Sequence, residues 1–266
     1  MIDNFNIQNI INSAFKIRKM QIELNNLLIN NKYNGIPFHL SFGNELFISF
    51  ICNIHNNLSL FLTHRNLIWN LFYIDDLYKY ISTINEDGVG LGSMNSSGVN
   101  SNIIYTTSIL GNNIPIAIGY AYSKKNSLIV ADTGDGAFEE GVNWESLHMM
   151  KKFHTPLLII IQDNDQSMYT NKSQRVNFEL KYDEIANAFN IDYLSIYQDD
   201  NLDVMSKKIL NVSNILKSKP LILHYKYKAI NNHHGATPGY TGDQLILTFD
   251  SNGLLTNRYD PLSNLK

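Results

Sequence analysis

Two apolar runs, each followed by a polar residue that can bind a metal ion, constrain the fold of this chain most. Residues 127–131 (Ser-Leu-Ile-Val-Ala) precede Gly-Asp-Gly-Ala at 134–137, and residues 156–161 (Pro-Leu-Leu-Ile-Ile-Ile) precede Asn164. Short apolar runs with a helix-like segment between them are typical of neighbouring buried strands in a parallel sheet. Because ligands of such sheets bind beyond the carboxyl ends of the strands, we expect Asp135 and Asn164 to lie close together.

The oxygen-bearing side chains at these two positions suit a magnesium ion that also binds a phosphate group. Mg²⁺ prefers carboxylate and carbonyl oxygens and usually keeps phosphate oxygens in its coordination shell. The glycines on both sides of Asp135 allow the backbone to approach a phosphate closely. The pattern therefore predicts a cofactor that carries a diphosphate, and it resembles the binding motif for thiamine diphosphate (ThDP).

Blocks of helical and strand-like sequence alternate along the chain and predict a three-layer α/β/α fold with a mostly parallel sheet. We expect one domain over residues 1–266, with an N-terminal helix within 1–34 and a C-terminal tail at 241–266. The expected helices span residues 8–30, a segment ending near 55, 67–84, 114–122, 139–152, 182–189 and 202–217, and the expected strands span 127–132, 157–163, 192–197 and 220–226.

The composition argues against a nucleic-acid partner and favours the cytoplasm. The net charge is −3, so the chain lacks the basic surface expected of a nucleic-acid-binding protein. Cys52 is the only cysteine, which excludes an intrachain disulfide and suits a reducing compartment such as the cytoplasm. We also expect no signal peptide, because residues 1–30 lack a basic segment followed by an apolar one, and no membrane contact, because no run is long enough to span a bilayer.

Several segments resemble the α subunits of ThDP-dependent 2-oxo acid dehydrogenase E1 components, in the transketolase-like superfamily. Together they extend over most of the chain, and the resemblance implies the fold of the ThDP pyrophosphate-binding domain. The N-terminal half of transketolases is also similar around the Trp-Glu pair at 144–145. The matching segments are 38–45 (with Asn44 for a usual Gln), 92–95 (with Asn95 for a usual His), 107–117, 134–145, and the His-His-Gly at 233–235.

The resemblance implies specific roles for the residues after the two apolar runs. The side chains of Asp135 and Asn164 and the backbone carbonyl of Gln166 would hold Mg²⁺. The backbone N–H groups of Gly136 and Ala137 would contact the diphosphate at the start of a helix.

Two further segments would complete the cofactor site. Arg65 matches an arginine that binds the terminal phosphate, a role that suits a guanidinium with its permanent charge. His64 stands where some members have a tyrosine. Ser108 and Leu110 resemble the pair beside the aminopyrimidine, where Leu110 would hold the cofactor in a bent shape; the alternative for Leu110 is a core residue.

Histidines are the candidates for catalysis. His234 matches the histidine of the family that acts on substrate and cofactor, and His233 and His39 are further candidates. An imidazole titrates near neutrality and can donate a proton or a hydrogen bond. The alternative is that each of these histidines is structural.

The resemblance also implies a partner, because a glutamate on a separate pyrimidine-binding domain must activate ThDP. The chain ends at Lys266, soon after the His-His pair, so we expect a β-type E1 subunit to supply this glutamate in an α₂β₂ assembly. A lipoyl acyltransferase is a further expected partner, although the tail is shorter than in ordinary E1 α subunits.

Three functions remain open from the sequence. The first is the α subunit of a ThDP- and Mg²⁺-dependent enzyme that decarboxylates a 2-oxo acid and transfers the acyl or aldehyde unit. The second is a subunit of a split transketolase-like enzyme or carboligase acting on ketoses or aldehydes. The third is a non-catalytic binding subunit. Residues 38–45 and the 29-residue separation of positions 135 and 164 favour the first, whereas Trp144 and the short chain favour the second.

Overall fold

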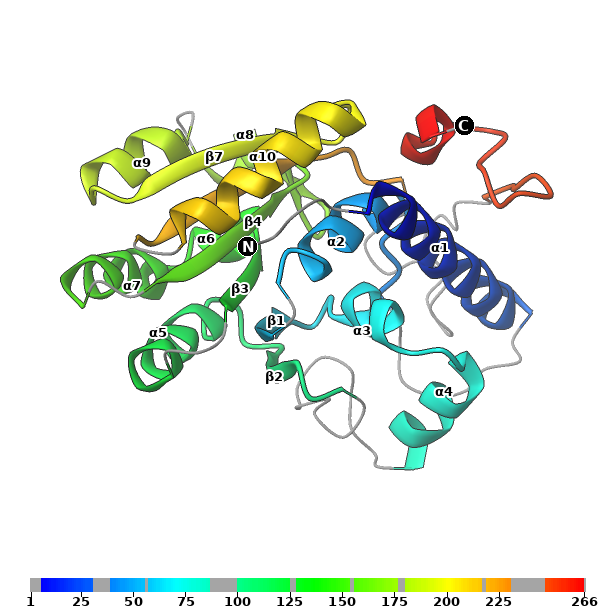
Figure 1. Cartoon of the computed structure of the whole chain (residues 1–266), viewed down its shortest axis with the longest axis horizontal. Coiled ribbons are helices and arrows are strands. Elements are labelled where there is room, and N and C mark those ends of the chain that lie inside the picture. The colour runs from blue at the N-terminus through cyan, green and yellow to red at the C-terminus, as the bar shows by residue number, and fades with distance from the viewer. Residues whose placement is uncertain are drawn as a thin grey trace.

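The protein contains a six-stranded parallel sheet in the order β2-β1-β3-β4-β8-β7, seen in the computed structural model (Figure 1). The structure describes residues 6–30, 39–55, 57–86, 100–124, 128–153, 156–176, 180–216, 219–230 and 247–265. The six strands are β1 (Leu58–Thr63), β2 (Ile103–Thr107), β3 (Leu128–Gly134), β4 (Leu157–Asp163), β7 (Asp192–Tyr197) and β8 (Leu221–Lys226). A short antiparallel ribbon is formed by β5 (Gln166–Ser167) and β6 (Thr170–Asn171).

Helices pack on both faces of the sheet, which confirms the predicted three-layer fold. One layer contains α1 (Ile7–Ile29), α2 (Glu45–Cys52), α3 (Leu67–Tyr73), α4 (Leu77–Glu86) and α10 (Leu202–Ile215). The other contains α5 (Asn113–Ser123), α7 (Gly141–Lys152) and α9 (Tyr182–Ala188). Two single-turn helices, α6 (Asp135–Phe138) and α8 (Lys172–Arg175), follow β3 and β6 respectively, and a 3₁₀ turn spans Pro261–Leu265. None of the described helices is long and apolar enough to cross a membrane.

Strand β4 shows why its sequence is continuously apolar. Successive side chains of a strand point to opposite faces, and both faces of this sheet are covered by helices. Leu158 and Ile160 accordingly lie in the core beneath α1 and α2, whereas Leu157, Ile159 and Ile161 lie in the core beneath α5 and α7. All five are buried, so the strand places its carboxyl end at a fixed depth between two apolar layers.

The structure corrects two predicted helices. The single helix expected at 67–84 is interrupted, because Ile74 is extended and Asp76 accepts a hydrogen bond from Lys79 N at 3.0 Å, which starts α4. An aspartate side chain that accepts this hydrogen bond stabilises the start of a new helix, which favours a break over continuation of the preceding helix. The helix expected at 139–152 begins two residues later, and the preceding turn forms the separate α6.

Strands β1 and β2 were not predicted. β1 is six residues long and β2 five. Such short apolar runs cannot be distinguished from parts of a helix by periodicity alone. The remaining predicted strands and helices are confirmed with shifts of at most three residues at their ends, the largest at α2, which ends at Cys52 rather than near residue 55.

A buried ion-pair network joins helix α1, helix α2 and the C-terminal segment. Arg18 of α1 is fully buried and donates to Glu45 of α2 (Nε–Oε1, 2.8 Å) and to Asp260 (Nη2–Oδ1, 3.0 Å). Glu45 also accepts from Gln21 Nε2 at 2.7 Å and from the backbone N–H of Gly43 at 2.8 Å. Figure 1 shows the C-terminal segment beside α1, as these contacts require. They support the prediction of one domain over 1–266, which stays a prediction.

We predict that Arg18→Met lowers the free energy of unfolding by about 3 to 5 kcal/mol, because it leaves Glu45 and Asp260 buried without their cation. Urea denaturation followed by circular dichroism measures the change. Lys16→Met is the matched control on the same helix, since it removes an ion pair to an Asp75 side chain that is 95% exposed. Equal denaturation midpoints for the two variants would contradict the importance of the buried network.

Candidate cofactor and metal site

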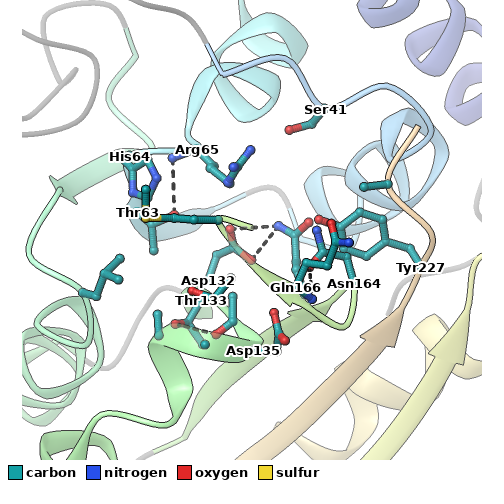
Figure 2. A pocket seen from close by; sticks show the side chains of 18 of the residues that line it. Ser41, Thr63, His64, Arg65, Asp132, Thr133, Asp135, Asn164, Gln166 and Tyr227 are labelled. Atoms are coloured by element: carbon teal, nitrogen blue, oxygen red, sulfur yellow. Dashed lines mark hydrogen bonds between the residues drawn. The ribbon is translucent and has the colours of Figure 1, made fainter. Parts of the chain in front are cut away.

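A cavity of about 240 Å³ lies where the carboxyl ends of five neighbouring strands meet (Figure 2). Each of these strands is followed by residues that line it. The predicted cofactor and metal residues that line it are Ser108 and Leu110 after β2, His64 and Arg65 after β1, Asp135, Gly136 and Ala137 after β3, and Asn164 and Gln166 after β4. The structure therefore brings these nine residues together, while their individual roles stay predictions.

The pairing of β3 with β4 explains why the two predicted magnesium ligands are neighbours. Gly134 stands in register with Gln162, so Asp135 and Asn164 follow adjacent strand ends. Asp165 adopts a left-handed backbone conformation with φ of 62°, and Gln166 N donates to Asn164 Oδ1 at 3.1 Å. An amide oxygen has two lone pairs, so this tight turn still leaves Asn164 able to bind a cation.

The electrostatics around Asp135 favour a cation. Burial raises the pKa of Asp135 to about 6, the nearby Asp163 adds to this rise, and the guanidinium of Arg175 opposes it. Arg175 Nη2 lies 2.7 Å from Asp135 Oδ2 and 3.0 Å from Glu139 Oε1. Asp135 and Glu139 thus share the guanidinium of Arg175, and the neighbouring Asp163 pairs with Lys172 Nζ at 2.6 Å. An additional positive charge at this end of the cavity would stabilise the ionised form of Asp135.

The residues present fit Mg²⁺ and a diphosphate. The available donors are carboxylate, amide and backbone oxygens, which are hard ligands of the kind Mg²⁺ prefers. Residues 6–265, apart from the undescribed stretches, contain no group of three or more His, Cys, Asp or Glu side chains that could hold another type of metal. A Cβ at Gly136 would lie 2.6 Å from the side chain of Ser167, so only glycine allows the two loops to approach this closely.

Arg65 supplies positive charge on a different side of the cavity from Asp135 (Figure 2). The side chain is half-buried, and burial lowers its pKa while Tyr227 acts in the opposite direction. A guanidinium nevertheless stays protonated in proteins. A partly desolvated cation of this kind binds phosphate oxygens strongly, because little water competes for the contact.

The predicted catalytic histidines are only partly described. His39 packs edge-to-face on His64, with ring centroids 4.9 Å apart, so it lies next to a residue that lines the cavity. His233 and His234 lie outside the described residues, and so does the segment at 92–95. Their roles stay predictions.

Sequence reasoning missed a buried polar chain under the cavity. Asn44 Nδ2 donates to Gln162 Oε1 at 3.1 Å, and Gln162 Nε2 donates to Asp132 Oδ1 at 2.8 Å. Trp69 Nε1 also donates to Asp132, at 3.2 Å. Burial raises the pKa of Asp132 to about 7, and the hydrogen bonds from Gln162 and Trp69 partly oppose the rise. A polar residue near the end of an otherwise apolar strand was the available signal for both Asp132 and Gln162.

Tyr227 is another lining residue that was missed. It directly follows β8, just as Asp135 follows β3. The rule that binding residues follow the carboxyl ends of parallel strands would have found it.

Comparison with known proteins links the chain to one family. The family model described as "Dehydrogenase E1 component" matches residues 28–233. The chain is 26% identical over 181 residues to pyruvate dehydrogenase E1 component subunit alpha of Zymomonas mobilis, covering 66% of this chain and 49% of that protein. It is 26% identical over 140 residues to the mitochondrial counterpart of Solanum tuberosum, covering 50% and 34%. The chain thus spans about half the length of the Zymomonas mobilis protein and about a third of the Solanum tuberosum protein.

Three further proteins resemble the chain, one in sequence and two in structure. The large subunit of acetolactate synthase isozyme 2 from Escherichia coli is 25% identical over 134 residues, covering 46% of this chain and 23% of that protein. The solved structure of transketolase from Campylobacter jejuni superposes with a TM-score of 0.65 at 17% identity, covering 83% of this chain and 38% of that one. Transketolase from Leishmania mexicana gives 0.62 at 14%, covering 81% and 36%. These two structural likenesses establish the fold alone.

We predict that Asp132→Asn stabilises the protein increasingly as the pH rises. The folded carboxyl titrates near 7 and its ordinary value is 3.8, so between these limits the folded state binds a proton that the unfolded state has lost. Wild-type stability therefore falls with pH there, by up to about 1.4 kcal/mol per unit, and asparagine removes this slope. Urea denaturation at pH 5 and pH 8 measures the difference between variant and wild type. Asp203→Asn, on an exposed part of α10, is the control, and a difference for Asp132→Asn that does not change with pH would contradict the assignment.

Proposed function

Because the chain belongs to the dehydrogenase E1 component family, we propose that it is the α subunit of a two-component enzyme that decarboxylates a 2-oxo acid. The enzyme would use ThDP, the cofactor that this family implies, together with Mg²⁺, and would transfer the acyl or aldehyde unit to an acceptor. One observation carries the proposal. Asp135 and Asn164, from paired strands, line the same cavity as Arg65.

The metal end of the site would be built from three oxygens. Asp135 would contribute its carboxylate, Asn164 its side-chain amide oxygen and Gln166 its backbone carbonyl. The support is that these residues lie at the ends of neighbouring strands and that the local oxygen donors match the preference of Mg²⁺. The N–H groups of Gly136 and Ala137, at the start of α6, would donate to the diphosphate.

The remaining cavity residues would bind and orient the organic part of the cofactor. Arg65, assisted by His64, would hold the terminal phosphate. Ser108 and Leu110 would pack beside the aminopyrimidine, with Leu110 enforcing the bent shape. The support for this role of Leu110 is that its side chain is 37% exposed at the cavity, so it is not the core residue that the alternative required.

When bound, ThDP supplies an electron sink for the carbon atom that loses CO₂. The chain's own contribution is to place acid–base groups beside that carbon. His234 would donate and accept protons there, with His233 and His39 as neighbouring imidazoles. The support from the described residues is the contact of His39 with His64 at the cavity.

A partner would complete the site. We propose a β-type subunit with a pyrimidine-binding domain, in an α₂β₂ assembly, and a lipoyl acyltransferase as the acceptor's carrier. Two observations support a partner: the relatives are named as alpha subunits, and apolar side chains are exposed at or beside the cavity. Ile109, which is 66% exposed, and Leu110 are the clearest of these. Apolar groups exposed together beside a binding site are typical of protein interfaces.

The second candidate is a transketolase-like or carboligase subunit that passes the unit to a sugar or aldehyde. The sequence likeness to the large subunit of acetolactate synthase favours it. The acceptor separates the two enzymes. Copurification with the native partner, followed by dye reduction across a panel of 2-oxo acids, supports the E1 reaction. Carbon–carbon bond formation with ketoses or aldehydes, without dye reduction, supports the carboligase.

We predict that Asp135→Ala weakens the binding of ThDP with Mg²⁺ by at least about 100-fold, because it removes the only carboxylate proposed to bind the metal. Isothermal titration calorimetry on the full chain, alone and with its copurified partner, measures the affinity. Asp203→Ala serves as the control for loss of one acidic residue. If neither wild type nor variant binds the cofactor, the non-catalytic subunit becomes the better account.

We also predict that Arg65→Gln weakens binding of thiamine diphosphate by roughly 10- to 100-fold, the range expected for losing a hydrogen bond between charged groups. Thiamine monophosphate lacks the terminal phosphate, so the same variant is expected to bind it almost as well as wild type. Calorimetry with both compounds makes the comparison. An equal loss for both would mean that Arg65 does not contact the terminal phosphate.

A further inference from the structure

Two basic residues of one helical turn connect acidic residues from both strand tips of the metal site. Lys172 and Arg175 begin and end α8. Lys172 Nζ lies 2.6 Å from Oδ2 of Asp163, the last residue of β4. Arg175 Nη2 lies 2.7 Å from Oδ2 of Asp135, the residue that follows β3. The single turn α8 therefore bridges the ends of the two central strands.

On the β4 side, Asp163 fixes the turn that contains Asn164. Its Oδ1 accepts the backbone N–H of Asp165 at 3.0 Å, and its Oδ2 lies 2.8 Å from His224 Nε2. The backbone N–H of Lys172 donates to Asp165 O at 2.9 Å. Asp165 is thus held through both its N–H and its carbonyl group. These contacts fix where the neighbouring amide of Asn164 points.

On the β3 side, Arg175 contacts Asp135 at the start of α6, Glu139 just after α6, and the ribbon. Besides Asp135, its Nε contacts Glu139 Oε2 at 3.1 Å and its Nη1 donates to Thr170 O at 2.7 Å. The side chain of Arg175 is only 13% exposed, so water screens these contacts weakly. The close approach of Gly136 to Ser167 lies next to the same guanidinium.

We propose that α8 acts as an electrostatic clamp that sets the spacing and orientation of the two Mg²⁺ ligands, Asp135 and Asn164, with Arg175 as the main positioning residue. The inference rests on the proposed function, because it concerns the same site. Arg175 donates a hydrogen bond to Oδ2 of Asp135, which leaves Oδ1 of this carboxylate to bind the cation. Partners that hydrogen-bond to a metal-ligating carboxylate fix its orientation and typically change metal affinity by 10- to 100-fold.

The alternative is that Arg175 competes with the cation, and this alternative predicts the opposite change in metal affinity. If its guanidinium only took the place of the cation on Asp135, it would compete with Mg²⁺, and its removal would tighten metal binding. The contacts with Glu139 and Thr170 favour the clamp, since they hold Arg175 at the edge of the site independently of Asp135.

The first test measures the dissociation constant of Mg²⁺ at saturating ThDP by calorimetry on the full chain. Arg175→Gln is expected to weaken Mg²⁺ binding by about tenfold or more, and Arg175→Lys to restore part of the loss. Lys208→Gln is the control, because it breaks a partly buried ion pair between Lys208 of α10 and Asp200, neither of which lines the cavity. Unchanged or tighter Mg²⁺ binding by Arg175→Gln would overturn the clamp.

The second test needs no cofactor and reads the turn itself. Hydrogen exchange of the Gln166 and Lys172 amides, which donate to Asn164 and Asp165, is expected to accelerate in Arg175→Gln and Lys172→Gln but not in Lys208→Gln. Unchanged exchange in both α8 variants would overturn the clamp.

Failure of the wild type to bind Mg²⁺ and ThDP would contradict the proposed function and, with it, this role of α8. Normal wild-type binding with an unaffected Arg175→Gln would contradict the clamp alone.

Discussion

The parallel pairing of β3 with β4 is the interaction on which the rest of the site depends. The register that sets Gly134 opposite Gln162 brings the residues after both strands to one edge of the sheet. The apolar layers above and below these strands hold that edge at a fixed depth. A shift of register by one residue would turn every side chain of β4 to the opposite face. The packing of the core therefore fixes the register, and the register fixes the position of the site.

Buried polar groups then connect this edge to the rest of the molecule. The network of Arg18, Glu45 and Asp260 fixes the turn before α2. This turn carries Ser41 to the cavity and Asn44 to Gln162. Asn44 continues into the chain of hydrogen bonds that ends at Asp132. Each such group is stable in the interior only because its partners are present, so these networks specify one arrangement of the loops around the cavity.

The sequence predicted the elements whose patterns are local. The unbroken apolar run of β4 and the helical period of α1 identify those elements without knowledge of their neighbours. The residues directly after β3 and β4 predict the candidate site, and they line one cavity. Arg175 could not be found in this way, because its role depends on a contact with Asp135, 40 positions earlier in the chain. Strands β1 and β2 were missed since a short apolar run becomes a strand only by pairing with β3 or with each other.

We propose that the ends of β3 and β4 hold a divalent cation together with a diphosphate. Crystals of the full chain grown with ThDP and Mn²⁺ in place of Mg²⁺ test it most directly, because manganese gives an anomalous signal that locates the ion. We predict one manganese peak within coordination distance of Asp135, Asn164 and two phosphate oxygens. A peak elsewhere, or ThDP bound with no metal between these two residues, would contradict the account.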